Sequence, residues 1–221
     1  MVTRCHVRSS GTQYSDAADA VRRLADVLVS GALLVVFLIP MALIAIAVHL
    51  EDSGPALFRQ ERVGLRGSRF TLLKFRTMFQ GGDDRAHRDL IARELRGEDT
   101  VENGSSKLSN DRRVTRIGAF LRKTSLDELP QLFNVLRGEM TLVGPRPCLD
   151  WEAEMFPAEF EPRFSVPPGL TGLWQVSGRN RLPYSDRVAL DAQYAAQWSL
   201  WLDIKILART VWVVLSRDGS C

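Results

Sequence analysis

Two adjacent acids, Asp127 and Glu128, are the residues of this sequence whose types and spacing point most directly to chemistry. Arg122 lies shortly before them, and Arg146 follows between two prolines. Carboxylates can bind Mg²⁺ together with phosphate oxygens, and arginine can bind phosphate through two parallel hydrogen bonds. Acids and arginines in one short segment therefore indicate phosphoryl chemistry.

The position of the two acids allows a structural role as well as a chemical one. Ser125 and Glu128 have the spacing of a capping box, in which Glu128 would only satisfy backbone donors at a helix start. Asp127 fits that role less well. We expect the positive end of the helix to lower the pKa of Asp127 and to attract phosphate. An ionised aspartate beside a phosphoanhydride can act as a nucleophile or as a ligand of Mg²⁺.

Four basic residues are candidates for phosphate binding, and they are spread along the sequence. The prolines beside Arg146 restrict its backbone, so less conformational entropy is lost on binding. Arg179 follows Gly178 in a glycine-rich stretch where the backbone could approach a ligand closely. For each residue taken alone, a surface salt bridge is the simpler explanation. The four candidates are Lys74, Arg122, Arg146 and Arg179.

A long apolar segment, residues 27–50, contains no Asp, Glu, Lys or Arg. As a helix it would be about 36 Å long, which is enough to cross a hydrocarbon core of about 30 Å. Pro40 lies within the segment and removes one helix hydrogen bond, so we expect a bend there. Basic residues mark the cytoplasmic side of a membrane. Arginines on both sides therefore favour a re-entrant helix over a full span: Arg4, Arg8, Arg22 and Arg23 before the segment, and Arg59, Arg62, Arg66 and Arg69 after it.

Short strands and helices are predicted for the rest of the chain. Segments 56–63 and 68–77 form a predicted hairpin around a glycine-bounded turn. Lys74 and Arg76 share one face of it, because side chains alternate along a strand. A helix that Gly138 ends follows the two acids. Its predicted buried face consists of Leu129, Leu132, Phe133 and Leu136. The other predicted elements are helices at 14–50, 86–95, 184–198 and 200–216, a strand at 140–143 and an irregular stretch at 157–168.

Composition limits the architecture. A chain of 221 residues, 45% hydrophobic and 25% charged, has room for one domain and a membrane element. We predict an α+β fold in which residues 1–52 form an N-terminal arm and a re-entrant membrane helix. Residues 53–221 form a small, mainly helical catalytic domain with a short β-hairpin and amphipathic helices. The last helix, 200–216, has an apolar face that suits either the membrane interface or the protein core. Three separated cysteines indicate free thiols, and no motif indicates nucleic-acid binding.

Four ordered segments of the sequence carry a resemblance to a known family. They are GPALFRQERVG (54–64), FTLLKFRTM (70–78), the stretch 111–147 that contains the two acids, and PGLTGLWQVSGR (168–179). Together they resemble the bacterial sugar transferases, the monotopic phosphoglycosyl transferases, over roughly residues 21–218. The resemblance implies transfer of a sugar 1-phosphate from a UDP-sugar to undecaprenyl phosphate, with release of UMP. It also implies a cytoplasmic-facing site at the bacterial inner membrane.

The resemblance assigns roles to the candidate residues. Asp127 would attack the phosphorus that carries the sugar and form a phosphosugar-aspartyl intermediate. Glu128 would support proton transfer or the binding of Mg²⁺, for which both acids are candidate ligands. The last segment is most similar to short members that start exopolysaccharide or O-antigen chains with galactose or glucose. One departure is that Ile39 precedes Pro40, where many relatives have a serine. The implied phosphate-binding residues are Lys74, Arg122, Arg146 and Arg179.

Three other functions are alternatives to this one. A membrane-anchored scaffold without activity would use Asp127 only as a helix cap. A glycosidase is disfavoured, because adjacent helical residues point about 100° apart while its two carboxylates must flank one bond. A glycosyltransferase metal site at Asp83 and Asp84 is disfavoured, because this pair lies in a predicted loop.

Overall fold

The computed structural model describes residues 16–79, 85–96, 98 and 113–216. Several sequence-based predictions lie outside these residues: the N-terminal arm, the loop around 102–110, the Asp83–Asp84 pair, and the state of Cys5 and Cys221. Cys148 is buried and free, as predicted. The described residues form an α+β fold that begins with a long apolar helix and contains two small sheets, which confirms the predicted class.

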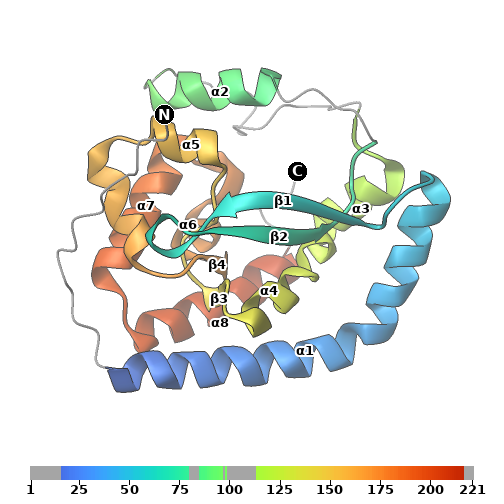
Figure 1. Cartoon of the computed structure of the whole chain (residues 1–221), viewed down its shortest axis with the longest axis horizontal. Coiled ribbons are helices and arrows are strands. Elements are labelled where there is room, and N and C mark those ends of the chain that lie inside the picture. The colour runs from blue at the N-terminus through green and yellow to red at the C-terminus, as the bar shows by residue number, and fades with distance from the viewer. Residues whose placement is uncertain (1–15, 80–84, 97, 99–112, 217–221) are drawn as a thin grey trace.

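The first element is a single helix, α1 (Asp16–Glu51), which confirms the predicted helix at 14–50. Pro40 lies inside it, and the helix continues through the proline rather than ending there. Figure 1 shows α1 running along the bottom of the molecule and bending upward toward its C-terminal end. A proline is a common cause of such a bend, because one backbone hydrogen bond is lost. Only 11% of the most apolar stretch of α1 is buried against the protein.

Buried polar contacts hold the N-terminal half of α1 against the domain. Arg22 is only 7% exposed; it donates a hydrogen bond to the Thr141 hydroxyl at 2.9 Å and lies 3.5 Å from a carboxylate oxygen of Asp203. Asp26 accepts a hydrogen bond from the backbone N–H of Leu142 at 3.0 Å. Arg22 was expected to be a charge flanking the membrane segment, but these contacts give it a structural role in the domain.

The predicted hairpin is confirmed by two antiparallel strands, β1 (Leu57–Val63) and β2 (Arg69–Phe75). The turn between them is a 3₁₀ segment, η1 (Leu65–Gly67). β2 ends before Arg76, which is buried and donates to the backbone oxygens of Val48 and Asp52 at the end of α1. Arg76 therefore ties the hairpin to α1.

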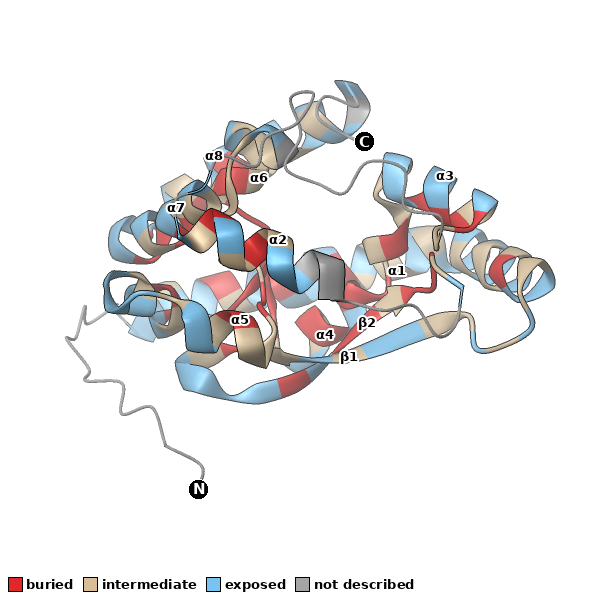
Figure 2. Ribbon diagram, turned by 90° about the horizontal axis from the view of Figure 1, so that it is seen from above, coloured by how far each residue is buried: buried red, intermediate tan, exposed pale blue. Residues whose placement is uncertain are grey.

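Helix α4 (Gln131–Arg137) packs between β2 and α1, as Figure 1 shows, and ends at Gly138, whose φ of +82° is the predicted left-handed stop. Its predicted buried face is partly wrong, because Phe133 is 42% exposed. Leu129 precedes the helix, and the polar residues Gln131 and Asn134 are buried on the inward face. Figure 2 shows α4 as one of the most buried helices. Its buried residues are Gln131, Leu132, Asn134 and Val135.

A second sheet joins two segments that are far apart in the sequence. β3 (Thr141–Val143), which was predicted, pairs in parallel with β4 (Gly169–Thr171), which was not. Glycines permit this pairing: a Cβ atom on Gly169 would lie 2.0 Å from the backbone nitrogen of Gly144, and one on Gly172 would lie 2.4 Å from its oxygen. These glycines of the 168–179 motif thus allow backbone packing, while close approach of this stretch to a ligand stays a prediction.

The remaining helices surround these elements, and the predictions at 86–95, 184–198 and 200–216 are confirmed. The stretch at 157–168, predicted as irregular, is mostly 3₁₀ helix. The α-helices are α2 (Arg85–Leu95), α3 (Arg116–Thr124), α5 (Asp150–Met155), α6 (Leu173–Ser177), α7 (Tyr184–Gln197) and α8 (Leu200–Ser216); the other 3₁₀ segments are η2 (Leu126–Glu128), η3 (Ala158–Ser165) and η4 (Arg179–Arg181).

Candidate active site

The two acids lie in η2, the short 3₁₀ turn between α3 and α4. Ser125 has a left-handed backbone (φ 58°) and caps the end of α3, and its side chain makes no capping hydrogen bond to η2. The predicted capping box is therefore wrong, because Ser125 ends one helix instead of starting the next. Pro130 then leads into α4, so Asp127 and Glu128 precede the α-helix rather than forming its first turn.

Glu128 binds two of the predicted cations through one oxygen. Its Oε1 accepts a hydrogen bond from Lys74 Nζ at 3.0 Å and one from Arg146 Nη1 at 3.1 Å. Burial alone would raise the pKa of Glu128, but the charges of Lys74 and Arg146 outweigh burial and hold that pKa far below its usual value. Glu128 is therefore ionised at neutral pH and holds together side chains from β2 and from the segment after β3.

Asp127 is 8% exposed, and its carboxylate takes no hydrogen bond from the part of the chain that the structure describes. Burial and the adjacent Glu128 charge raise its pKa, while Lys74, Arg122 and Arg146 act to lower it. The sequence-based expectation of a lowered pKa is wrong, because burial and the Glu128 charge outweigh the nearby cations. Asp127 is thus a buried carboxylate, surrounded by cations but not bonded to them.

Arg122 is placed by an unusually close contact between α3 and the chain after β2. A Cβ atom on Gly118 would lie 2.2 Å from the backbone oxygen of Thr77, so glycine is needed at this position. Arg122 Nε then donates to the Thr77 hydroxyl at 2.9 Å. Arg179 lies in η4 and is not among the charges that shift the pKa of Asp127 or Glu128 most. The structure thus brings three of the four predicted cations to the acids.

Asn134 supports this arrangement, although the sequence analysis gave it no role. It is completely buried; its side chain accepts from the backbone N–H of Leu73 at 3.1 Å and donates to the oxygen of Thr71 at 2.7 Å. The amide therefore pairs with the backbone of β2 directly beside Lys74. The available signal was an asparagine within a short apolar helix, a residue type that helices do not favour.

We expect replacement of Asn134 by Ala to destabilise the protein by about 2–5 kcal/mol, because buried backbone groups of Thr71 and Leu73 would lose their partner. Denaturant unfolding in detergent measures the change. Asn134→Asp is the matched comparison, since it keeps an acceptor for Leu73 but loses the donor to Thr71. A loss below about 1 kcal/mol for the Ala variant would contradict this structural role.

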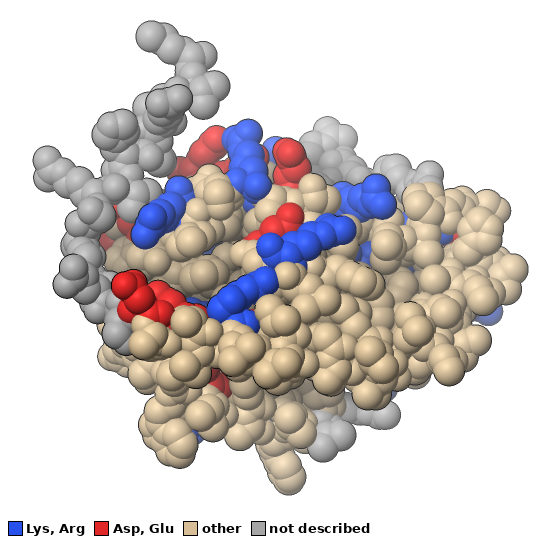
Figure 3. Space-filling model, turned by 60° about the horizontal axis from the view of Figure 1, so that its bottom comes forward, with Lys and Arg blue, Asp and Glu red and all other residues tan. Residues whose placement is uncertain are grey.

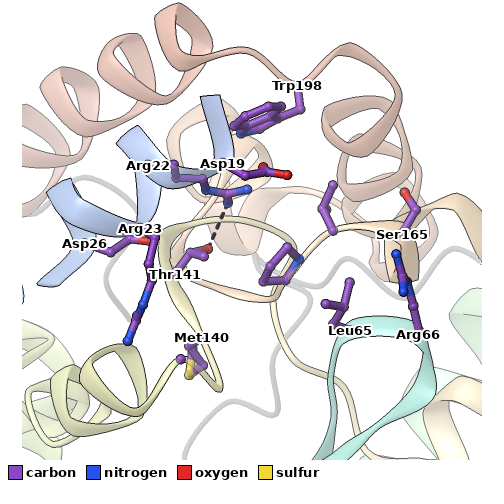
Figure 4. Close-up of a pocket in the computed structure, with 13 residues that line it drawn as sticks. Asp19, Arg22, Arg23, Asp26, Leu65, Arg66, Met140, Thr141, Ser165 and Trp198 are labelled. Atoms are coloured by element: carbon purple, nitrogen blue, oxygen red, sulfur yellow. Dashed lines mark hydrogen bonds between the residues drawn. The ribbon is translucent and has the colours of Figure 1, made fainter. Parts of the chain in front are cut away.

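A separate cavity of about 230 Å³ lies beneath the N-terminal half of α1. Figure 4 shows Arg22 and Asp19 above it, Met140 below and Trp198 at the top, with the bond from Arg22 to Thr141 dashed. None of the candidate acids and cations lines this cavity. The acids therefore lie outside this cavity.

The donor set fits a magnesium ion that is shared with a substrate. Among the described residues no group of three or more His, Cys, Asp and Glu side chains could hold a metal by itself. Mg²⁺ is commonly bound by one or two carboxylates together with substrate phosphates and water. Asp127, whose carboxylate is not engaged in a hydrogen bond, and the adjacent Glu128 supply that number of acids.

Comparison with known proteins identifies the family. The family described as bacterial sugar transferase matches residues 17–217, so this chain belongs to it, and the resemblance found in the sequence is confirmed. The chain is 47% identical to the UDP-galactose-lipid carrier transferase of Erwinia amylovora, over 97% of this chain and 44% of that protein.

Two further relatives are matched over most of their own length. The chain is 43% identical to exopolysaccharide production protein ExoY of Rhizobium meliloti (strain 1021), over 90% of this chain and 87% of the relative. It is 41% identical to the UDP-glucose:undecaprenyl-phosphate glucose-1-phosphate transferase of Caulobacter vibrioides, over 97% and 77% of the two chains. By contrast, it spans less than half the length of the Erwinia relative and of other curated relatives that it matches.

Proposed function

We propose that this protein transfers a sugar 1-phosphate from a UDP-sugar to undecaprenyl phosphate and releases UMP. The observation that carries the proposal is Asp127, a buried carboxylate without a hydrogen bond that lies among Lys74, Arg122 and Arg146. The names of the relatives, a UDP-galactose-lipid carrier transferase and a UDP-glucose transferase, support galactose or glucose as the sugar. The name of the Rhizobium relative supports a role at the start of exopolysaccharide synthesis.

In the proposed mechanism Asp127 is the nucleophile. One carboxylate oxygen attacks the phosphorus that carries the sugar, and the anhydride bond between the two phosphates breaks. UMP leaves with the bonding electron pair, and the sugar phosphate remains on Asp127 as an acyl phosphate. A phosphate oxygen of the lipid then attacks the same phosphorus, which frees Asp127 and forms the lipid diphosphate sugar. Two displacements of this kind are typical of covalent catalysis.

The cations of the site have donors left for the substrate. Lys74 carries three N–H donors and Arg146 carries five, and each uses one on Glu128 in this structure. Their remaining donors can bind the diphosphate oxygens and stabilise charge that develops as the anhydride breaks. Mg²⁺ held by Asp127, Glu128 and the donor phosphates would neutralise further negative charge on the anhydride.

The exposed apolar surface supports action at a membrane. On α1, Val35, Ile39 and Leu50 are each more than 70% exposed, and on α8 Trp201 and Trp212 are 63% and 73% exposed. Figure 3 shows a broad uncharged surface on the face that includes α1, with lysines and arginines along one side of it. We propose that α1 enters the inner membrane, bends at Pro40 and returns to the cytoplasmic face. α8 would lie at the interface, beside the lipid phosphates.

This topology predicts that tags at the two ends of the chain lie on the same side of the membrane. In spheroplasts, both an N-terminal and a C-terminal tag should resist external protease and become digestible only after permeabilisation. A periplasmic marker protein serves as the positive control for digestion. Digestion of the N-terminal tag alone in intact spheroplasts would show that α1 spans the membrane.

The activity itself is tested with membranes that contain the protein, undecaprenyl phosphate, Mg²⁺ and a panel of UDP-sugars. We expect release of UMP, together with a lipid-linked sugar, from UDP-galactose or UDP-glucose. Membranes without the protein correct for background hydrolysis. If no UDP-sugar in the panel yields UMP above that background, the proposed function is wrong, and an inactive membrane-anchored scaffold becomes the better description.

A further inference from the structure

Arg146 is held through its backbone as well as through its side chain. Arg163 in η3 donates from Nη2 to the backbone oxygen of Arg146 at 2.6 Å. Asp191 in α7 accepts from the backbone N–H of Arg146 at 3.3 Å. The same two side chains form an ion pair with each other, Nη2 to Oδ2, at 2.9 Å. The backbone N–H and the backbone oxygen of Arg146 are therefore both hydrogen-bonded to the same pair of charged side chains, Arg163 and Asp191.

We infer that Arg163 and Asp191 are positioning residues, which fix the backbone of Arg146 so that its side chain reaches Glu128 and the donor phosphates. The contact with the donor phosphates rests on the proposed function. The local sequence gives a reason for this arrangement. Arg146 stands between Pro145 and Pro147, which have no backbone N–H. Its own N–H is therefore the single backbone donor of this tripeptide, and Asp191 accepts from it.

Stability alone explains the buried pair poorly. Arg163 is 4% exposed and Asp191 is 2% exposed. Within the described residues, Nε and Nη1 of Arg163 and Oδ1 of Asp191 have no hydrogen-bond partner. Buried ion pairs that leave polar atoms unsatisfied often stabilise a protein no better than apolar residues of the same size. A pair of this kind is more readily explained by the geometry that it imposes on Arg146.

Two aromatic side chains also contact the guanidinium group of Arg163. Arg163 lies 4.8 Å from the ring centre of Phe156 and 5.4 Å from that of Phe164. These distances are within the range of cation–π attraction. The guanidinium is thus confined by two rings, one carboxylate and one backbone oxygen, which leaves Arg146 little freedom to shift.

The first test measures the backbone directly and does not depend on activity. Because prolines flank Arg146, hydrogen exchange at its amide can be followed in a short peptide that contains few other exchangeable amides. We expect Arg163→Lys to accelerate exchange at Arg146 at least about 10-fold, because lysine lacks the planar guanidinium that Phe156 and Phe164 hold with Nη2 between Asp191 and the Arg146 oxygen. Lys205→Met, which changes an exposed residue on α8, is the control and should leave this amide unchanged. Unaltered exchange in Arg163→Lys would overturn the inference.

The second test asks whether Arg163 acts through Arg146 in the reaction. We expect Arg163→Lys to lower kcat about 10- to 100-fold, since small displacements of positioned groups have effects of this size. In an Arg146→Ala background the same change should cost almost nothing further, because residues that act as a unit are not additive. Asp191→Asn, which keeps an acceptor oxygen, provides a second variant and should lose less activity than Arg163→Lys.

Outcomes of the kinetic test separate the two proposals. Additive losses in the double variant would overturn the positioning role. An absence of UMP release by the wild-type protein would instead remove the proposed function. In that case hydrogen exchange at Arg146 still decides whether Arg163 and Asp191 hold this backbone.

Discussion

Replacement of Asp127 by Asn is expected to reduce UMP release by roughly 10³-fold or more, while the protein becomes no less stable. Asn has nearly the same shape but cannot form the acyl phosphate. The carboxylate of Asp127 takes no hydrogen bond among the described residues, so the amide breaks no contact there. An inactive variant with an intact fold would separate a nucleophile from a structural cap.

The direction of the stability change follows from the pKa of Asp127. Burial and the Glu128 charge raise that pKa in the folded protein. A carboxyl group of this kind favours the folded state below its unfolded pKa, and this contribution is lost as the pH rises through the folded pKa. At neutral pH the ionised group is therefore a cost, and Asp127→Asn should raise the melting temperature.

Two measurements complete this prediction. Asp150→Asn is the matched control, because Asp150 is half-exposed and pairs with Arg69 at 3.2 Å, away from the acids; it should keep full activity. Mass spectrometry of the wild-type protein after brief incubation with a UDP-sugar should find the sugar phosphate on Asp127. UMP release at the wild-type rate by Asp127→Asn would rule out the covalent mechanism.

Replacement of Lys74 by Met is expected to lower kcat by about 10²- to 10³-fold, the usual effect of removing one group that stabilises transition-state charge. Lys74 is one of two cations on Glu128 Oε1, at 3.0 Å. Methionine retains the length of the side chain but removes its charge and its donors. We also expect a lower melting temperature, because Glu128 would keep only Arg146 as a partner.

The control for this change is Lys205→Met, because Lys205 lies exposed on α8, 5.4 Å from the ring of Trp201. It should retain the wild-type kcat in detergent. Initial rates over a range of UDP-sugar and Mg²⁺ concentrations distinguish a loss of kcat from weaker binding. If Lys74→Met keeps the wild-type kcat and changes only KM, Lys74 contributes to binding and not to the transition state.

The sequence predicted those helices and strands that have a long apolar run or a clear hydrophobic period. α1, the β1–β2 hairpin, α7 and α8 were all found, because each has a long apolar run or a clear period. The end of α4 at Gly138 was predicted because glycine readily adopts the left-handed conformation that ends a helix. β4 was missed, since three residues carry no period and their partner strand, β3, is far away in the sequence.

The sequence predicted which residues form the candidate site but not how they contact one another. Residue types identified Asp127, Glu128 and the cations, but only the fold shows that Lys74 and Arg146 share one oxygen of Glu128. The pKa of Asp127 was predicted in the wrong direction, because burial is a property of the folded chain. Arg163 and Asp191 carry no local signal, and a packed structure was needed to place them around Arg146.

The close backbone contact between Gly144 and Gly169 affects how the sequences of related proteins should be interpreted. Segments 142–147 and 168–172 fit together only because neither glycine has a side chain. Selection for this fit would act on any protein with the fold, whether or not it retains a reactive aspartate. A homologue could therefore keep both glycines and yet have lost the catalytic activity. Surveys of this family should score the acid and its cations separately from the glycines.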